Sequence, residues 1–169
     1  MFVELDRLPP PAWSDIDQQP CLKYASVSYA MLHSTPAIRS LVEPMLDTLP
    51  TEVDGATLID VRYWRHLSIG DIPGVPGWHY DVRNRPGTDL RETHRLYFVG
   101  AGCRTMFRDT AGNIVQPPES TIIAYGHDDV HCIAPATIAG PRLLVRCSLA
   151  SIRPVNHMYT TAHIHGVYP

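Results

Sequence analysis

Lysine is almost missing from this sequence, because Lys23 is the only lysine among 14 basic residues. Charged residues make up only 18% of the 169 residues and hydrophobic residues 44%, which excludes a disordered chain and indicates a folded one. The net charge of −3 gives no general attraction to nucleic acid or to an anionic membrane. Arginine suits fixed contacts with carboxylates and phosphates, so the arginine bias leaves room for a small anionic ligand.

Closely spaced pairs of cysteines are also absent from the sequence. The four cysteines have no CxxC spacing, which argues against a zinc ribbon or a thioredoxin-like site, and we expect most of them to be buried thiols. No apolar run approaches the length of a membrane span, and residues 1–13 lack the basic start and apolar core of a signal peptide. We therefore expect a cytoplasmic protein with no membrane partner.

Sixteen prolines and eleven glycines divide the chain into short segments, a pattern typical of β-rich domains. The expected strands are residues 57–64, 94–99, 103–107, 120–125 and 143–150, and Gly100-Ala101-Gly102 is expected to form a hairpin-like connection. These strands predict a mainly β fold, a double-stranded β-helix or jelly roll. The expected organisation is one domain, 1–169, with an N-terminal arm and helical support at 1–55, a jelly-roll core at 56–152 and a tail at 153–169.

One helix is expected in the N-terminal part. Thr35 before Pro36 is typical of a helix start, with a capping hydroxyl followed by an early proline. Apolar residues at helical spacing follow between residues 38 and 46, so we expect this helix to pack with one face on a sheet. Pro44 is expected to kink or split it.

The motif that suggests chemistry is His79-Tyr80-Asp81. On a strand, residues two apart point to the same face, so the imidazole of His79 and the carboxylate of Asp81 would converge. One nitrogen and one oxygen ligand suit a divalent transition metal, which needs a third ligand from elsewhere. His131 lies in an apolar strand and is favoured as that ligand over His127, which lies in the preceding turn beside two aspartates.

The order of these residues resembles a known family. The matching positions are His79, Asp81, His131, Pro135, Gly140 and Arg142, with a strand before each half. This order resembles that of the iron(II)- and 2-oxoglutarate-dependent dioxygenases, most closely their prolyl-hydroxylase-like branch. The resemblance implies iron(II) bound by the two histidines and Asp81, with 2-oxoglutarate and O2 as cosubstrates. It further implies a hydroxylase that couples decarboxylation of 2-oxoglutarate to succinate with oxidation of an unidentified substrate.

Such an enzyme must hold the distal carboxylate of 2-oxoglutarate, and a guanidinium does so with paired hydrogen bonds. Arg142 lies where the family places this anchor, and Arg146 competes for the role because it can share the same strand face. Tyr97 and Ser148 are further candidates for contacts with that carboxylate, each with core packing as the ordinary alternative.

The remaining candidates concern the substrate side. Three arginines of the 82–91 loop are candidates for the lip of the active site: Arg83, Arg85 and Arg91. Trp64 and Trp78 are candidates for the pocket wall. His163 and His165 in the tail could form an adventitious metal site. Two other functions compete with the oxygenase. A cupin-like metalloprotein with different chemistry would bind metal but not 2-oxoglutarate, and a jelly-roll binding or assembly module would bind no stoichiometric metal.

Overall fold

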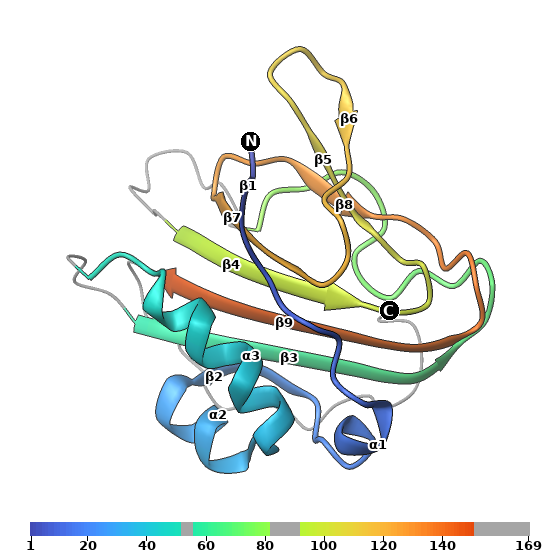
Figure 1. The fold of residues 1–169 in the computed structure, drawn as a ribbon. Helices are drawn as coiled ribbons and strands as arrows, with labels where there is room; N and C mark the ends of the chain where they lie inside the picture. The colour runs from blue at the N-terminus through green and yellow to red at the C-terminus, as the bar shows by residue number, and fades with distance from the viewer. Residues whose placement is uncertain (52–55, 82–91, 151–169) are drawn as a thin grey trace.

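Two antiparallel sheets form the body of the protein (Figure 1). The computed structural model describes residues 1–51, 56–81 and 92–150. In the larger sheet the order is β1 (Val3–Arg7), β7 (Thr121–Gly126), β4 (Glu92–Val99), β9 (Gly140–Ala150), β3 (Ala56–Leu67) and β2 (Leu22–Ser26). In the smaller it is β6 (Ile114–Val115), β5 (Thr105–Arg108) and β8 (His131–Ile133). The prediction of a mainly β fold is confirmed, and the antiparallel arrangement is consistent with a jelly roll.

Side-chain alternation along β9 separates two apolar cores. Leu143, Val145 and Cys147 belong to a core shared with the helices, whereas Leu144 belongs to a core between the two sheets. Successive side chains on a strand point to opposite faces, so Arg142 and Arg146 share the inward face of Leu144. The polar side chains that β9 directs between the two sheets are therefore those of its even-numbered residues.

The helices are α1 (Trp13–Ile16), α2 (Val27–His33) and α3 (Pro36–Asp47). Figure 1 shows α2 and α3 on the opposite side of the larger sheet from β5, β6 and β8. The hydroxyl of Thr35 accepts the Ile38 backbone N–H at 3.3 Å and caps α3. No helix in the described ranges is long and apolar enough to span a membrane.

α3 continues through Pro44, so of the two expected effects of this proline, a kink or a split, the split does not occur. A proline inside a helix removes one backbone hydrogen bond. The buried face of Ile38, Leu41 and Met45 belongs to the core shared with the sheet. Burial of this apolar face offsets the missing bond, because most helical stability in proteins comes from such packing.

The N-terminal region is more ordered than the expected extended arm. β1 pairs with β7 and α1 follows it. All five β1 side chains are exposed, so this edge strand is held by backbone pairing with β7 and not by a buried apolar face.

Gly100-Ala101-Gly102 carries the chain from one sheet to the other and is not a hairpin, because β4 and β5 lie in different sheets. All three residues have positive φ angles, of 95°, 55° and 60°. A Cβ at Gly100 would lie 2.3 Å from the carbonyl oxygen of Pro141. Glycine is required here both for the backbone conformation and for this close approach.

Arg95 on β4 ties the sheet to the end of α3. Its Nε donates to the Thr48 hydroxyl at 3.0 Å, its Nη2 donates to the Thr48 carbonyl, and its Nη1 donates to the His94 carbonyl at 3.1 Å. Thr48 is the C-cap of α3, where backbone carbonyls lack helical partners.

Replacing Arg95 with methionine is expected to lower the free energy of unfolding by about 2–3 kcal/mol, since methionine keeps the apolar stem but removes charge-assisted hydrogen bonds. Urea unfolding followed by circular dichroism measures this. The control is Arg39→Met on the exposed side of α3, expected to change stability by less than about 0.5 kcal/mol. Equal effects of the two substitutions would contradict the assigned role of Arg95.

Candidate metal site

A single antiparallel bridge brings the two candidate histidine ligands together. The backbone N–H of His79 donates to the His131 carbonyl at 2.9 Å, and the N–H of His131 donates to the His79 carbonyl at 3.0 Å. Residues directly opposite each other in such a pair project their side chains to the same side. The two ring centroids lie 4.6 Å apart. His79 is thus positioned by pairing with the first residue of β8, not by a regular strand of its own.

Backbone carbonyls fix the tautomer of both imidazoles. Nδ1 of His79 lies 3.0 Å from the Gly77 carbonyl, and Nδ1 of His131 lies 3.0 Å from the Asp129 carbonyl. A carbonyl only accepts hydrogen bonds, so each Nδ1 carries a proton and each Nε2 is available as a ligand. A backbone carbonyl on the second ring nitrogen is the usual support of a metal-binding histidine.

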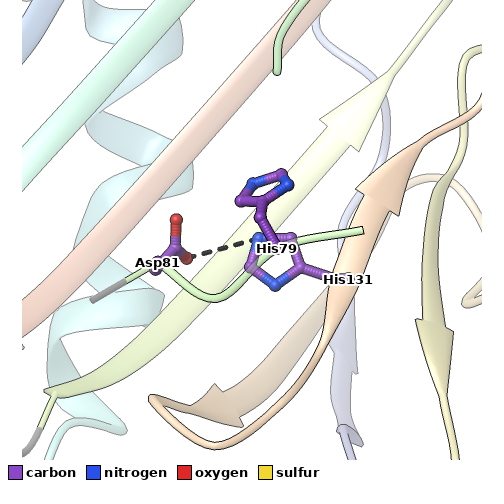
Figure 2. Close-up of side chains that lie close together, drawn as sticks. All are labelled: His79, Asp81 and His131. Atoms are coloured by element: carbon purple, nitrogen blue, oxygen red, sulfur yellow. Dashed lines mark ion pairs between the residues drawn. The ribbon is translucent and has the colours of Figure 1, made fainter. Parts of the chain in front are cut away.

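Asp81 faces these imidazoles as an ionised carboxylate. Its Oδ2 lies 3.5 Å from Nε2 of His131 (Figure 2), and its Oδ1 accepts from Nη1 of Arg146 at 2.6 Å. Burial by itself would raise the pKa of Asp81. Nearby charges and donors, of which Arg146 has the largest effect, outweigh burial and hold this pKa well below its usual range.

The three side chains fit one divalent metal ion. Each offers a ligand atom to a group whose atoms all lie within 4.8 Å of one another. Metal–ligand bonds of about 2.1 Å at right angles separate neighbouring ligand atoms by roughly 3 Å, so small side-chain rotations close the site. Nε2 of His131 and Oδ2 of Asp81 are both lone-pair donors, so their approach is favourable only with a cation between them, either a proton or a metal ion. Two imidazoles and one carboxylate form the donor set of a facial triad with open positions.

A cavity of about 380 Å³ opens beside this triad. Its wall includes apolar side chains of both sheets, among them Leu96, Leu144 and Ile133. Val75 and Tyr80 also line it and are 53% and 44% exposed, so they mark its mouth. The cavity can therefore admit a small molecule from solvent and hold one end of it in an apolar interior.

Two arginines in the cavity wall are bound to aspartates. Asp60 on β3 accepts from Arg62 Nε and Nη2 at 3.0 and 2.6 Å, and from Nη2 of its cross-strand neighbour Arg146 at 3.2 Å. Arg146 therefore lies between the carboxylates of Asp60 and Asp81. Its charge is largely neutralised within the protein.

Arg142 differs from both. It is 0% exposed, and none of its three guanidinium nitrogens has a hydrogen-bond partner among the described residues. The indole ring of Trp64 lies beneath it, with the guanidinium carbon 5.1 Å from the ring centroid. Burial lowers the pKa of Arg142 to about 10, so the side chain still carries its charge at neutral pH. A buried charge without an acceptor is costly, and an anionic ligand would relieve that cost.

Thr105 is a second unsatisfied polar group of the interior. Its hydroxyl lines the cavity and has no hydrogen-bond partner among the described residues. Arg142 does not line the cavity, but it lies two residues from the lining residue Leu144 on the same face of β9. The unpartnered guanidinium therefore lies further along the strand face that borders the cavity.

Several predicted residues lie elsewhere. Tyr97 belongs to the core on the helix side of the larger sheet, and its hydroxyl donates to the Pro9 carbonyl at 3.4 Å, so its phenol does not reach the cavity. Ser148 contacts Nδ1 of His94 at 2.8 Å and does not line the cavity. His127 pairs with Asp128 at 3.2 Å and does not join the triad. Strand alternation explains the position of the Tyr97 side chain, because odd-numbered residues of β4 face the helices.

The two candidate tryptophans do not line the cavity either. Trp64 packs against Arg142, and Trp78 lies 4.3 Å beneath the guanidinium of Arg108. The arginines of the 82–91 loop and the histidines of the tail lie outside the described residues.

Sequence reasoning missed Tyr125, Asp60 and His94. The Tyr125 hydroxyl donates to Oδ2 of Asp81 at 2.6 Å. His94 is buried beside the triad, and burial, followed by the charge of Arg146, lowers its pKa to about 3, so it is neutral. A polar residue inside an apolar strand is the only sequence signal for these three, and it does not name the partner.

Comparison with known proteins adds little to what the residues of the site show. Searches against protein-family models and against curated proteins found no match. One similar solved structure is an oxidoreductase of the 2OG-Fe(II) oxygenase family from Burkholderia pseudomallei, with 12% sequence identity and a TM-score of 0.40. The alignment covers 78% of this chain and 60% of that chain. At this level of similarity, any functional argument depends on the residues of the site.

Proposed function

We propose that the protein is an iron(II)- and 2-oxoglutarate-dependent oxygenase, most simply a hydroxylase of the prolyl-hydroxylase-like type. The observation that carries the proposal is Arg142, a fully buried and charged guanidinium without an acceptor among the described residues, on the inward strand face that also bears the cavity of the triad. A metal ion alone would explain the triad. An additional anion would also explain the arginine.

His79, Asp81 and His131 are the residues that would hold iron(II). When bound there, iron(II) supplies the redox chemistry by which 2-oxoglutarate and O2 give succinate and CO2, with the second oxygen atom entering the substrate. The Nδ1–carbonyl hydrogen bonds keep both imidazoles oriented, and Asp81 stays ionised because Arg146 stabilises its charge.

Arg142 would bind the distal carboxylate of 2-oxoglutarate through two parallel hydrogen bonds. Thr105 is the described residue best suited to add a hydroxyl contact, in place of Tyr97 and Ser148. Arg146 is the weaker anchor, since both of its terminal nitrogens already donate to aspartates. Arg142 does not line the cavity, so neighbouring side chains would have to move for the keto acid to reach it.

The direct test is turnover. Purified protein supplied with iron(II), ascorbate, O2 and 2-oxoglutarate is expected to form succinate slowly even without the primary substrate, and omission of iron(II) is expected to abolish this. Calorimetric titration of 2-oxoglutarate into metal-loaded protein separates the oxygenase from a cupin-like metalloprotein. Stoichiometric metal binding without keto-acid binding or succinate would contradict the proposal and favour the cupin.

A further inference from the structure

Both oxygens of the Asp81 carboxylate are held by donors from the larger sheet. Tyr125 on β7 donates its hydroxyl to Oδ2 at 2.6 Å, and Arg146 on β9 donates Nη1 to Oδ1 at 2.6 Å. Nη1 of Arg146 also lies 3.4 Å from the Tyr125 hydroxyl and donates to it. The three groups form a closed triangle in which the arginine polarises the phenol that holds the carboxylate.

The environment of Tyr125 keeps it a donor. Its side chain is buried, with its ring edge-on to His131 at 5.3 Å and tilted against His94 at 4.7 Å between centroids. A carboxylate oxygen only accepts hydrogen bonds, so at 2.6 Å the phenol proton is directed at Oδ2 of Asp81, the oxygen nearest His131.

We propose that Tyr125 is a positioning residue of the metal site: its hydroxyl holds Oδ2 of Asp81 toward His131 and, together with Arg146 on Oδ1, keeps this carboxylate a single-oxygen ligand. The inference rests on the proposed metal site and is independent of 2-oxoglutarate chemistry. A carboxylate has about four lone-pair positions. Arg146 occupies Oδ1, and Tyr125 occupies one lone pair of Oδ2, so the remaining lone pair of Oδ2 faces the imidazoles.

The hydrogen bonds of Tyr125 and Arg146 to Asp81, called the clamp below, limit how this carboxylate can bind a metal ion. A carboxylate that is free to rotate can bind a metal through both oxygens and fill an additional coordination position. With Oδ1 bound to a guanidinium, the triad contributes three ligand atoms and leaves positions open for exogenous ligands. Asp60 supports the arrangement because it accepts Nη2 of Arg146 and fixes the guanidinium in place.

The test is the binding of cobalt(II) to the full chain, measured by calorimetry and by the visible absorption of the cobalt protein. Tyr125→Phe keeps the ring contacts and removes only the hydroxyl, so we expect the dissociation constant to rise about 10- to 100-fold and the cobalt bands to shift. The matched control is Tyr63→Phe, because the Tyr63 hydroxyl also contacts a carboxylate, Asp17 at 3.3 Å, but on the helix side of the sheet. This control is expected to leave both readouts unchanged.

Arg146→Gln examines the same clamp from the other oxygen and is likewise expected to weaken cobalt binding. Thermal unfolding of each variant shows whether it is folded. A folded Tyr125→Phe protein with wild-type cobalt affinity and spectrum would overturn the positioning role while leaving the metal site intact. Failure of the unaltered protein to bind stoichiometric cobalt would overturn the metal site and the positioning role together.

Discussion

Replacing His131 with alanine is expected to abolish stoichiometric metal binding and, with it, any succinate formation. The substitution removes one of three proposed ligands and leaves Asp81 without the imidazole that faces it at 3.5 Å. Loss of a supporting hydrogen bond alone weakens metal sites 10- to 100-fold, so loss of a ligand should lower the affinity by more than about 100-fold. Metal analysis after dialysis and calorimetry with cobalt(II) measure the binding, and succinate assays measure turnover.

His127→Ala is the matched control, because it removes a nearby histidine that pairs with Asp128 outside the triad. We expect this variant to retain both metal and turnover. The backbone bridge between residues 79 and 131 does not depend on the side chain, so both variants should fold. Loss of metal in His127→Ala but not in His131→Ala would show that the triad has been assigned to the wrong histidine.

Arg142→Met is expected to separate binding of the keto acid from stability. The variant should lose affinity for 2-oxoglutarate about 30- to 4000-fold, because truncating one partner of a buried charge pair costs about 2–5 kcal/mol. Its free energy of unfolding should be unchanged or higher, since the substitution removes a buried charge with no hydrogen-bond partner among the described residues. Cobalt(II) affinity should stay within about threefold of wild type, because Arg142 contacts no residue of the triad.

Calorimetry with metal-loaded protein and urea unfolding measure the two quantities. Arg104→Met, on an exposed position of the segment between β4 and β5, is the control and should change neither. Arg146→Met should show the complementary pattern, with weakened metal binding through Asp81. If Arg142→Met leaves keto-acid binding intact and Arg146→Met abolishes it without affecting metal, the anchor is Arg146.

The local chemistry of the candidate site could be read from the sequence. His79 and Asp81 are two residues apart and His131 lies in an apolar strand, so residue type and spacing were enough to name these three, whereas Arg142 was named from its place in the family resemblance. The same alternation predicted the mainly β fold. These features can be recognised in the sequence because strand periodicity and ligand preference depend on residues close together in the chain.

The tertiary structure alone decided which partners these residues meet. Sequence spacing could not show that Tyr97 faces the helices, that Arg146 lies between Asp60 and Asp81, or that Tyr125 holds the carboxylate, because each depends on the register of strands far apart in the chain. A shift of one residue in that register moves every side chain to the other face. The order of residues therefore determined the candidate ligands, and strand pairing decided which buried groups are satisfied and which, like Arg142, have no hydrogen-bond partner among the described residues.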